Sequence, residues 1–78
     1  MVSPMDRAAL QQRLADVEAK ILDVESQISE QRQIIRKLEN LGHSAEHAKY
    51  LLAGLELLQA AYRDNHNALH TEMVDASD

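Results

Sequence analysis

The 78-residue chain contains no cysteine, phenylalanine or tryptophan, and it has only one proline, two glycines and two tyrosines. Without cysteine, disulfides and thiolate metal sites are excluded, which agrees with a reducing compartment. A core must therefore be built from leucine, isoleucine, valine and alanine. Such a core suits close packing of helices better than it suits a ligand pocket.

The chain also lacks a long hydrophobic run. Its most apolar window, residues 50–62, contains Glu56 and falls short of the roughly twenty apolar residues that a membrane-spanning helix needs. Residues 1–6 lack the basic region and apolar run of a secretory signal. We therefore expect a cytoplasmic protein that makes no membrane contact.

Positive charge is scarce as well, because the formal net charge is −5. Arg32, Arg36 and Lys37 form the basic cluster, and no aromatic side chain is interleaved with them. A nucleic-acid surface needs a broad positive patch that releases counterions. We interpret the cluster as a solvated helix face and expect no nucleic-acid partner.

What the sequence does contain is a seven-residue hydrophobic repeat in its first half. Spacings of four and three place these side chains on one stripe of an α-helix, which is the seam that two supercoiled helices bury against each other. The residues of this first seam are Leu10, Leu14, Val17, Ile21, Val24, Ile28, Ile35 and Leu38. The pattern predicts an all-α coiled-coil protein.

Signals at both ends of this stripe place the helix boundaries. Ser3, Pro4 and Asp6 are typical of a helix start, Gly42 of a helix end, and Ser44 of a cap for a second helix. So short a link forces two long helices to lie antiparallel. The prediction is a single domain, residues 1–78, with helix one at about 4–41, a turn at 41–44, helix two at about 45–73 and a polar tail at 74–78.

Helix two carries a matching seam, which we place at Ala48, Leu51, Leu55, Leu58, Tyr62, Asn65 and Leu69. Folding the chain at the turn pairs residues whose numbers add up to about 86, so that Ile35 faces Leu51. Gln31 and Asn65 are the polar members of the two seams. Polar seam residues cost stability and often set the register, although both amides could simply reach water at the rim.

A second apolar row remains on helix two after the seam is assigned. It consists of Tyr50, Gly54, Leu57, Ala61 and Ala68, interrupted by Asp64. A glycine within a helix costs up to about 1 kcal/mol relative to alanine, so Gly54 calls for a reason. A close crossing with another helix would supply one. Helix one, by contrast, has mostly charged or amide residues outside its seam, with Leu22, Ile34 and Leu41 as exceptions.

The simplest way to cover this second face is a second copy of the chain. We expect a homodimer, an antiparallel four-helix bundle with the first helices outside, that acts as a protein–protein interaction or regulatory module. A helical partner protein could cover the same face instead. The expected contact residues are Tyr50, Leu51, Leu52, Gly54, Leu55, Leu57, Leu58 and Ala61.

The alternative function is a metal-binding or metal-sensing bundle that uses paired histidines. His66 and His70 are four residues apart, as are His43 and His47, so each pair could face one way on a helix. Glu72 could add a ligand to the first pair. Two imidazoles are only half of a zinc site, and the hairpin separates the pairs by roughly 30 Å. We therefore expect surface histidines and no bound metal.

Catalysis and cofactors are not expected. A di-iron bundle needs Glu-x-x-His repeats on facing helices. None of Glu18, Glu25, Glu39, Glu56 and Glu72 has a histidine three residues later. No serine lies in a nucleophile elbow, and no glycine-rich loop could cradle a phosphate.

The segment Gln33–His43, with the sequence QIIRKLENLGH, is followed by Ala48, Leu51-Leu52 and Leu55-Glu56. This pattern resembles short uncharacterised bacterial proteins, especially those of α-proteobacteria. It covers about a third of the chain. The resemblance implies a small bacterial, cytoplasmic helical protein, and it transfers no functional residues.

Overall fold

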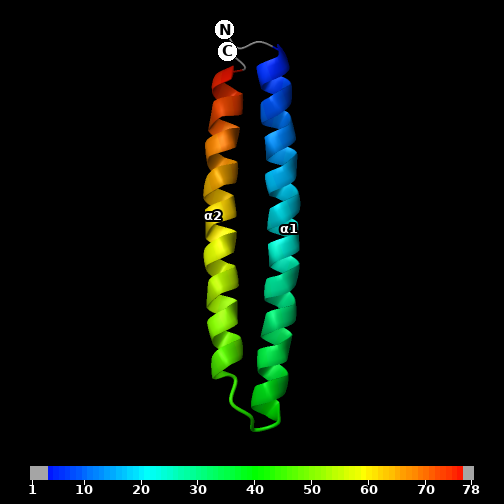
Figure 1. Cartoon of the computed structure of the whole chain (residues 1–78), viewed down its shortest axis with the longest axis vertical. Helices are drawn as coiled ribbons and strands as arrows, with labels where there is room; N and C mark the ends of the chain where they lie inside the picture. Colours follow the sequence, from blue (N-terminus) through cyan, green and yellow to red (C-terminus); the bar gives the residue numbers. More distant parts are fainter. Residues whose placement is uncertain (1–3, 77–78) are drawn as a thin grey trace.

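The computed structural model describes residues 4–76, with side chains described for residues 6–75. Helix α1 spans Pro4–Asn40 and helix α2 spans Glu46–Ala76. The two helices lie side by side and antiparallel, so that the start of α1 and the end of α2 lie at the same end of the rod (Figure 1). The rod measures 60 × 14 × 13 Å. The predicted all-α hairpin is confirmed.

The outer ends of the helices lie close to their expected positions. Helix α1 begins at Pro4, with Asp6 in its first turn, whereas the expected cap Ser3 lies outside the described residues. Helix α2 continues to Ala76, past the expected end at Met73. Val74 and Asp75, which we expected in a polar tail, therefore belong to the helix.

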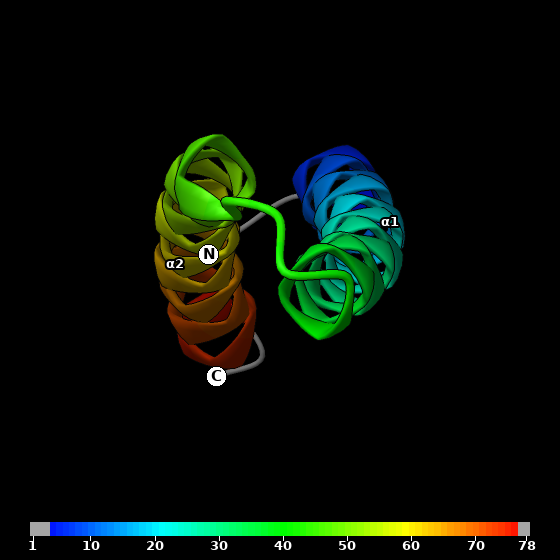
Figure 2. The same ribbon diagram turned by 90° about the horizontal axis from the view of Figure 1, so that it is seen from below.

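A glycine ends α1 through a hydrogen-bonded cap. Gly42 has a φ of 75°, the left-handed conformation that side chains with a Cβ rarely adopt. Its N–H donates to the carbonyl of Glu39 at 3.0 Å, and the N–H of His43 donates to the carbonyl of Leu38 at 2.9 Å. This pair of bonds is the Schellman motif, which satisfies carbonyls at the helix end. The reversal of the chain (Figure 2) thus follows from the backbone freedom of Gly42.

Ser44 caps the start of the second helix, as predicted. Its hydroxyl accepts a hydrogen bond from the N–H of Glu46 at 3.4 Å, and the carbonyl of Ala45 already accepts from Lys49 at 2.9 Å. An acceptor at this place satisfies an amide that has no partner within the helix. The connection between the two helices is therefore only residues 41–45.

The first seam lies at the interface throughout. Every one of its residues is buried or half-buried, from Leu10 to Leu38, and Val24 is the most enclosed with 2% of its surface exposed. Near the turn, Ile35 packs with Ala45 and Ala48, and Leu38 and Leu52 close over this cluster. The buried core is a single row of contacts between two helices, so it contains only small and medium side chains.

The second seam differs from our assignment. Leu51, Leu58 and Asn65 are exposed, and their neighbours Leu52, Gln59 and His66 lie half-buried at the interface instead. The observed seam is Ala45, Ala48, Leu52, Leu55, Gln59, Tyr62, His66, Leu69 and Met73. Its spacing alternates strictly between three and four, and that regularity is what keeps a stripe facing its partner. Continuous packing along the helix therefore outweighs the greater hydrophobicity of Leu58 relative to Gln59.

Gln31 occupies its seam position with a hydrogen bond. Its side-chain Nε2 donates to the carbonyl oxygen of Ala48 on the opposite helix at 3.0 Å, in a partly buried setting. A buried amide that has lost its water needs such a partner. The bond joins one particular position of α1 to one of α2, which suits the predicted role in register. Asn65 is exposed, so it has no such role within the hairpin.

We predict that Val24→Ala lowers the free energy of unfolding by about 1.5–3 kcal/mol, because this side chain loses nearly all of its exposure on folding. The matched change Leu22→Ala, two residues away at a site that is 68% exposed, should stay within about 0.5 kcal/mol of wild type. Urea unfolding followed by circular dichroism at one fixed protein concentration measures both. Equal losses would contradict the observed seam.

Candidate interaction surface

The seam divides the hairpin into two edges of different chemistry. Neighbouring seam residues in each helix are alternately three and four positions apart. The residue just before a pair that is three positions apart lies on one edge, and the residue just after that pair lies on the other. Because the helices are antiparallel, equivalent positions of α1 and α2 share an edge. We call the first the apolar edge and the second the ion-pair edge.

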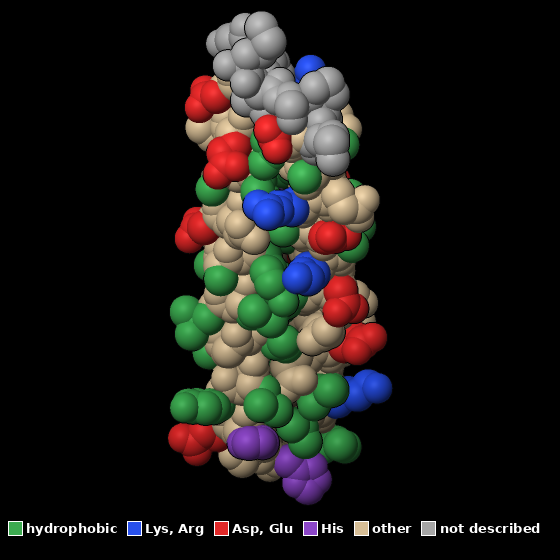
Figure 3. Space-filling view, turned by 45° about the horizontal axis from the view of Figure 1, so that its top comes forward, with side chains coloured by type: hydrophobic (Ala, Val, Ile, Leu, Met, Phe, Trp, Pro, Cys, Tyr) green, Lys and Arg blue, Asp and Glu red, His purple; other side chains and the backbone are tan. Residues whose placement is uncertain are grey.

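The apolar edge carries exposed aliphatic side chains from both helices. Ile34 lies on α1, and Leu41, one repeat later, directly follows the end of α1. Leu51 and Leu58 lie on α2. Figure 3 shows a face on which hydrophobic side chains gather over both helices in the half that ends at the turn, where histidines also lie. Towards the chain ends, the same edge becomes polar, with Asn65 on α2.

The outer side of α2 continues this apolar area. Tyr50 and Leu57 are 79% and 74% exposed, and they lie beside Gly54 and Ala61 on the surface of the helix, three or four residues away. After Ala61 the outer side becomes polar, beginning with Asp64. We define the turn-proximal apolar surface as Ile34, Leu41, Tyr50, Leu51, Gly54, Leu57, Leu58 and Ala61. It contains no charged residue.

The ion-pair edge is defined by ion pairs between the two helices. Three cross-helix pairs lie on it: Glu39–Lys49 at 3.2 Å, Arg32–Glu56 at 3.7 Å and Glu25–Arg63 at 3.3 Å. The side chains are between 42% and 58% exposed, so each pair contributes at most about 1 kcal/mol. The residue numbers of all three pairs add up to the same value, close to the predicted ~86. Opposite charges at these positions favour a single register.

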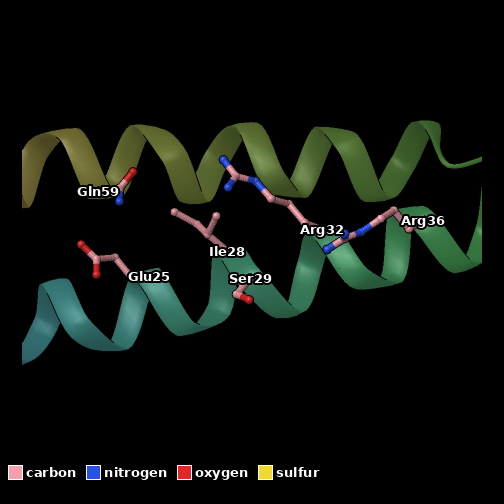
Figure 4. Close-up of a pocket in the computed structure, with 6 residues that line it drawn as sticks. All are labelled: Glu25, Ile28, Ser29, Arg32, Arg36 and Gln59. Atoms are coloured by element: carbon pink, nitrogen blue, oxygen red, sulfur yellow. The ribbon is translucent and has the colours of Figure 1, made fainter.

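A shallow groove of about 270 Å³ also lies on the ion-pair edge, and Figure 4 shows its lining residues. They are Glu25, Ile28, Ser29, Arg32, Arg36 and Gln59. Ile28 points towards α2 and Gln59 points towards α1, so both belong to the contact between the helices. Glu25 and Arg32 are already engaged in ion pairs. The groove is a seam between two helices, and its volume is below that of typical ligand pockets.

The predicted contact residues do not all remain available. Leu52 and Leu55 are half-buried in the hairpin's own interface, whereas the other six lie in the turn-proximal apolar surface. Sequence reasoning had noted Ile34 and Leu41 as apolar exceptions on α1 without placing them on this surface. The signal that connects them is the antiparallel geometry, because residues directly before a seam step meet on one edge.

The two histidine pairs lie in different parts of the structure. His66 lies half-buried in the seam, with its Nε2 3.2 Å from Oε1 of Glu18, and its ring is 6.4 Å from the ring of His70 between centroids. His43 lies in the turn, so the helical spacing that we assigned to His43 and His47 does not apply. Within residues 4–76, no group of three or more histidine, aspartate or glutamate side chains is arranged to hold a metal ion.

Neither helix, over the part that the structure describes, has a stretch both long and apolar enough to cross a bilayer. The chain matches no family model, and no curated protein or solved structure is significantly similar to it. The resemblance around the glycine turn therefore stays a prediction. The functional argument depends on the surface itself.

We predict that zinc binds no more tightly to wild type than to a His66→Ala, His70→Ala variant, because these two rings lack a third ligand among the described residues. Calorimetric titration with zinc measures binding, and circular dichroism shows whether the variant stays folded. Micromolar binding that the double substitution abolishes would contradict this prediction and favour the metal-binding alternative.

Proposed function

We propose that the chain is a self-associating helical hairpin that pairs through its turn-proximal apolar surface and works in the cytoplasm as an interaction or regulatory module without catalysis. The observation that carries this proposal is the continuity of large, exposed apolar side chains over α2 and the adjoining edge. Soluble monomers seldom expose apolar patches of more than a few hundred Å² unless the patch is a binding site.

The size of the surface supports association. Five of its residues have more than 45% of their area exposed, namely Ile34, Leu41, Tyr50, Leu51 and Leu57, and Leu58 is 41% exposed. A standard interface buries ~800 Å² on each partner, and six large exposed side chains together with Gly54 and Ala61 supply an area of this order.

The thin core also favours a partner. Among the described residues, the buried hydrophobic side chains are Val17, Val24, Ile28, Ile35, Ala45, Ala48 and Leu69. Domains of this size rarely reach comfortable stability from one small core, and oligomerisation is a common remedy. Packing a second copy on the apolar surface would roughly double the number of helices that share a core.

Charge is arranged so that it does not oppose this pairing. The net charge of −5 gives two copies a general repulsion, but the cross-helix ion pairs sit on the opposite edge. The apolar surface itself carries no charge that would have to lose its water. Association would therefore use the edge where desolvation costs least.

We predict that Leu57→Glu converts a dimer of wild-type chains to a monomer, raising the dimer dissociation constant at least ~30-fold, because a carboxylate would be buried without a partner. Leu22→Glu is the matched control. Leu22 is 68% exposed and Leu57 74%, but Leu22 lies on α1 away from the surface. Light scattering after size exclusion measures the mass over a range of concentrations.

Two results would contradict the proposal. One is a wild-type monomer at tens of micromolar concentration, and the other is equal weakening by Leu57→Glu and Leu22→Glu. A monomer that gains helicity only with a different helical protein from the native cell would assign the surface to that partner.

A further inference from the structure

Gly54 has no role within the hairpin. It lies in the middle of α2, and a Cβ built on it meets no atom within 4 Å. Gly42 also has open space, but its φ of 75° explains why glycine is there. Gly54 has no such backbone requirement, and alanine would suit a helix better. The reason for a glycine at this exposed site must therefore lie outside the single chain.

The residues around Gly54 form a symmetric pattern. Leu51 and Leu57 are three positions away on either side, and Tyr50 and Leu58 are four positions away. Residues three and four apart share a helix face, so all four surround the glycine on one side of α2. All four are exposed large hydrophobic residues. Reversing the direction of the helix about Gly54 therefore superimposes large apolar residues on large apolar residues.

This symmetry is what a two-fold interface requires. In such an interface the same patch is used by both subunits, and residue i contacts residue j while j contacts i. An antiparallel copy of α2 centred on Gly54 would place Tyr50 opposite Leu58 and Leu51 opposite Leu57. The glycines would face each other at the axis, where the absence of a side chain lets the backbones approach.

The outer parts of the face are compatible with the same axis. Asp64 would lie opposite Ser44, the cap at the start of α2, where the positive end of the helix favours a carboxylate. His47 would lie opposite Ala61. Among the residues of this face from His47 to Ala61 there is no aspartate, glutamate, lysine or arginine, so this central part of the crossing brings no like charges together.

We propose that a second copy of this chain crosses α2 at Gly54, antiparallel and about a two-fold axis, with Leu51 of each copy against Leu57 of the other. This inference rests on the proposed self-association, and it adds the axis and the direction of the pairing. The pairing consumes the outer face of α2 and leaves the ion-pair edge open.

Engineered cysteines test the axis directly, because the chain has no cysteine of its own. Leu51→Cys and Leu57→Cys proteins, one of them carrying a mass tag, are mixed and oxidised, and the products are identified by mass spectrometry. We expect the mixed species to dominate over either self-crosslinked species by at least tenfold. Identical positions would lie six residues apart, about 9 Å along the helices, which is too far for a disulfide.

Other crosslinking results would overturn the axis. Efficient self-crosslinking of Leu51→Cys would indicate either parallel helices or an antiparallel crossing centred on Leu51, and both exclude the axis at Gly54. Preferential crosslinking in a mixture of Leu57→Cys and Leu58→Cys would shift the centre to the region between Gly54 and Ala61. Leu22→Cys, which lies on α1, measures the background of random collision.

Replacing the glycine tests the close approach. Gly54→Leu should keep the helical circular dichroism and raise the dimer dissociation constant at least tenfold, because a side chain at the axis would meet its own copy. Ala19→Leu, an enlargement at another exposed position, on α1, should leave the constant within twofold of wild type. An unchanged Gly54→Leu dimer would overturn the crossing at Gly54 while leaving self-association intact. A wild-type monomer would instead overturn the proposed function and this inference together.

Discussion

The packing of α1 on α2 along one seam is the interaction on which every other feature of the molecule depends. The seam is one side chain wide, and its alternating spacing of three and four residues determines which side chains each helix turns inward. Once Val24, Ile28 and Ile35 are buried, every other position is assigned to an edge or to an outer face. The chemistry of the surface is therefore a consequence of the packing of the core.

As a result of this packing, the two edges of the hairpin differ in chemistry. Charged residues directly after the seam steps meet across the helices and favour one register, at a modest energy because they stay hydrated. Aliphatic residues directly before the steps meet on the opposite edge, and in the turn half nothing polar covers them. A hairpin with one edge satisfied within the chain and the other left apolar is suited to directional association. Because small domains bury little apolar surface, such association would also enlarge the core.

Most of the fold could be predicted from short-range patterns. The first seam contains apolar residues at nearly every position, so its period is unambiguous. Gly42 and Ser44 have the side chains that helix termination and capping require, and both act as expected. The second seam was harder, because Gln59 is polar while its neighbour Leu58 is apolar, and because Leu51 and Leu52, like Asn65 and His66, do not differ in this way. Hydrophobicity alone favoured Leu58 and could not choose within the other two pairs, and only the requirement for an uninterrupted stripe against α1 selected Leu52, Gln59 and His66.

The sequence by itself determined two helices, their antiparallel order and a second apolar row on helix two, because helix period, capping and a short link are local properties. Only the tertiary structure decided that Leu52 is used within the hairpin and that Ile34 and Leu41 of the first helix adjoin Leu51 and Leu58 of the second. Those facts depend on the rotation of each helix about its axis. That rotation is set by the best continuous contact between two helices, which no single segment contains.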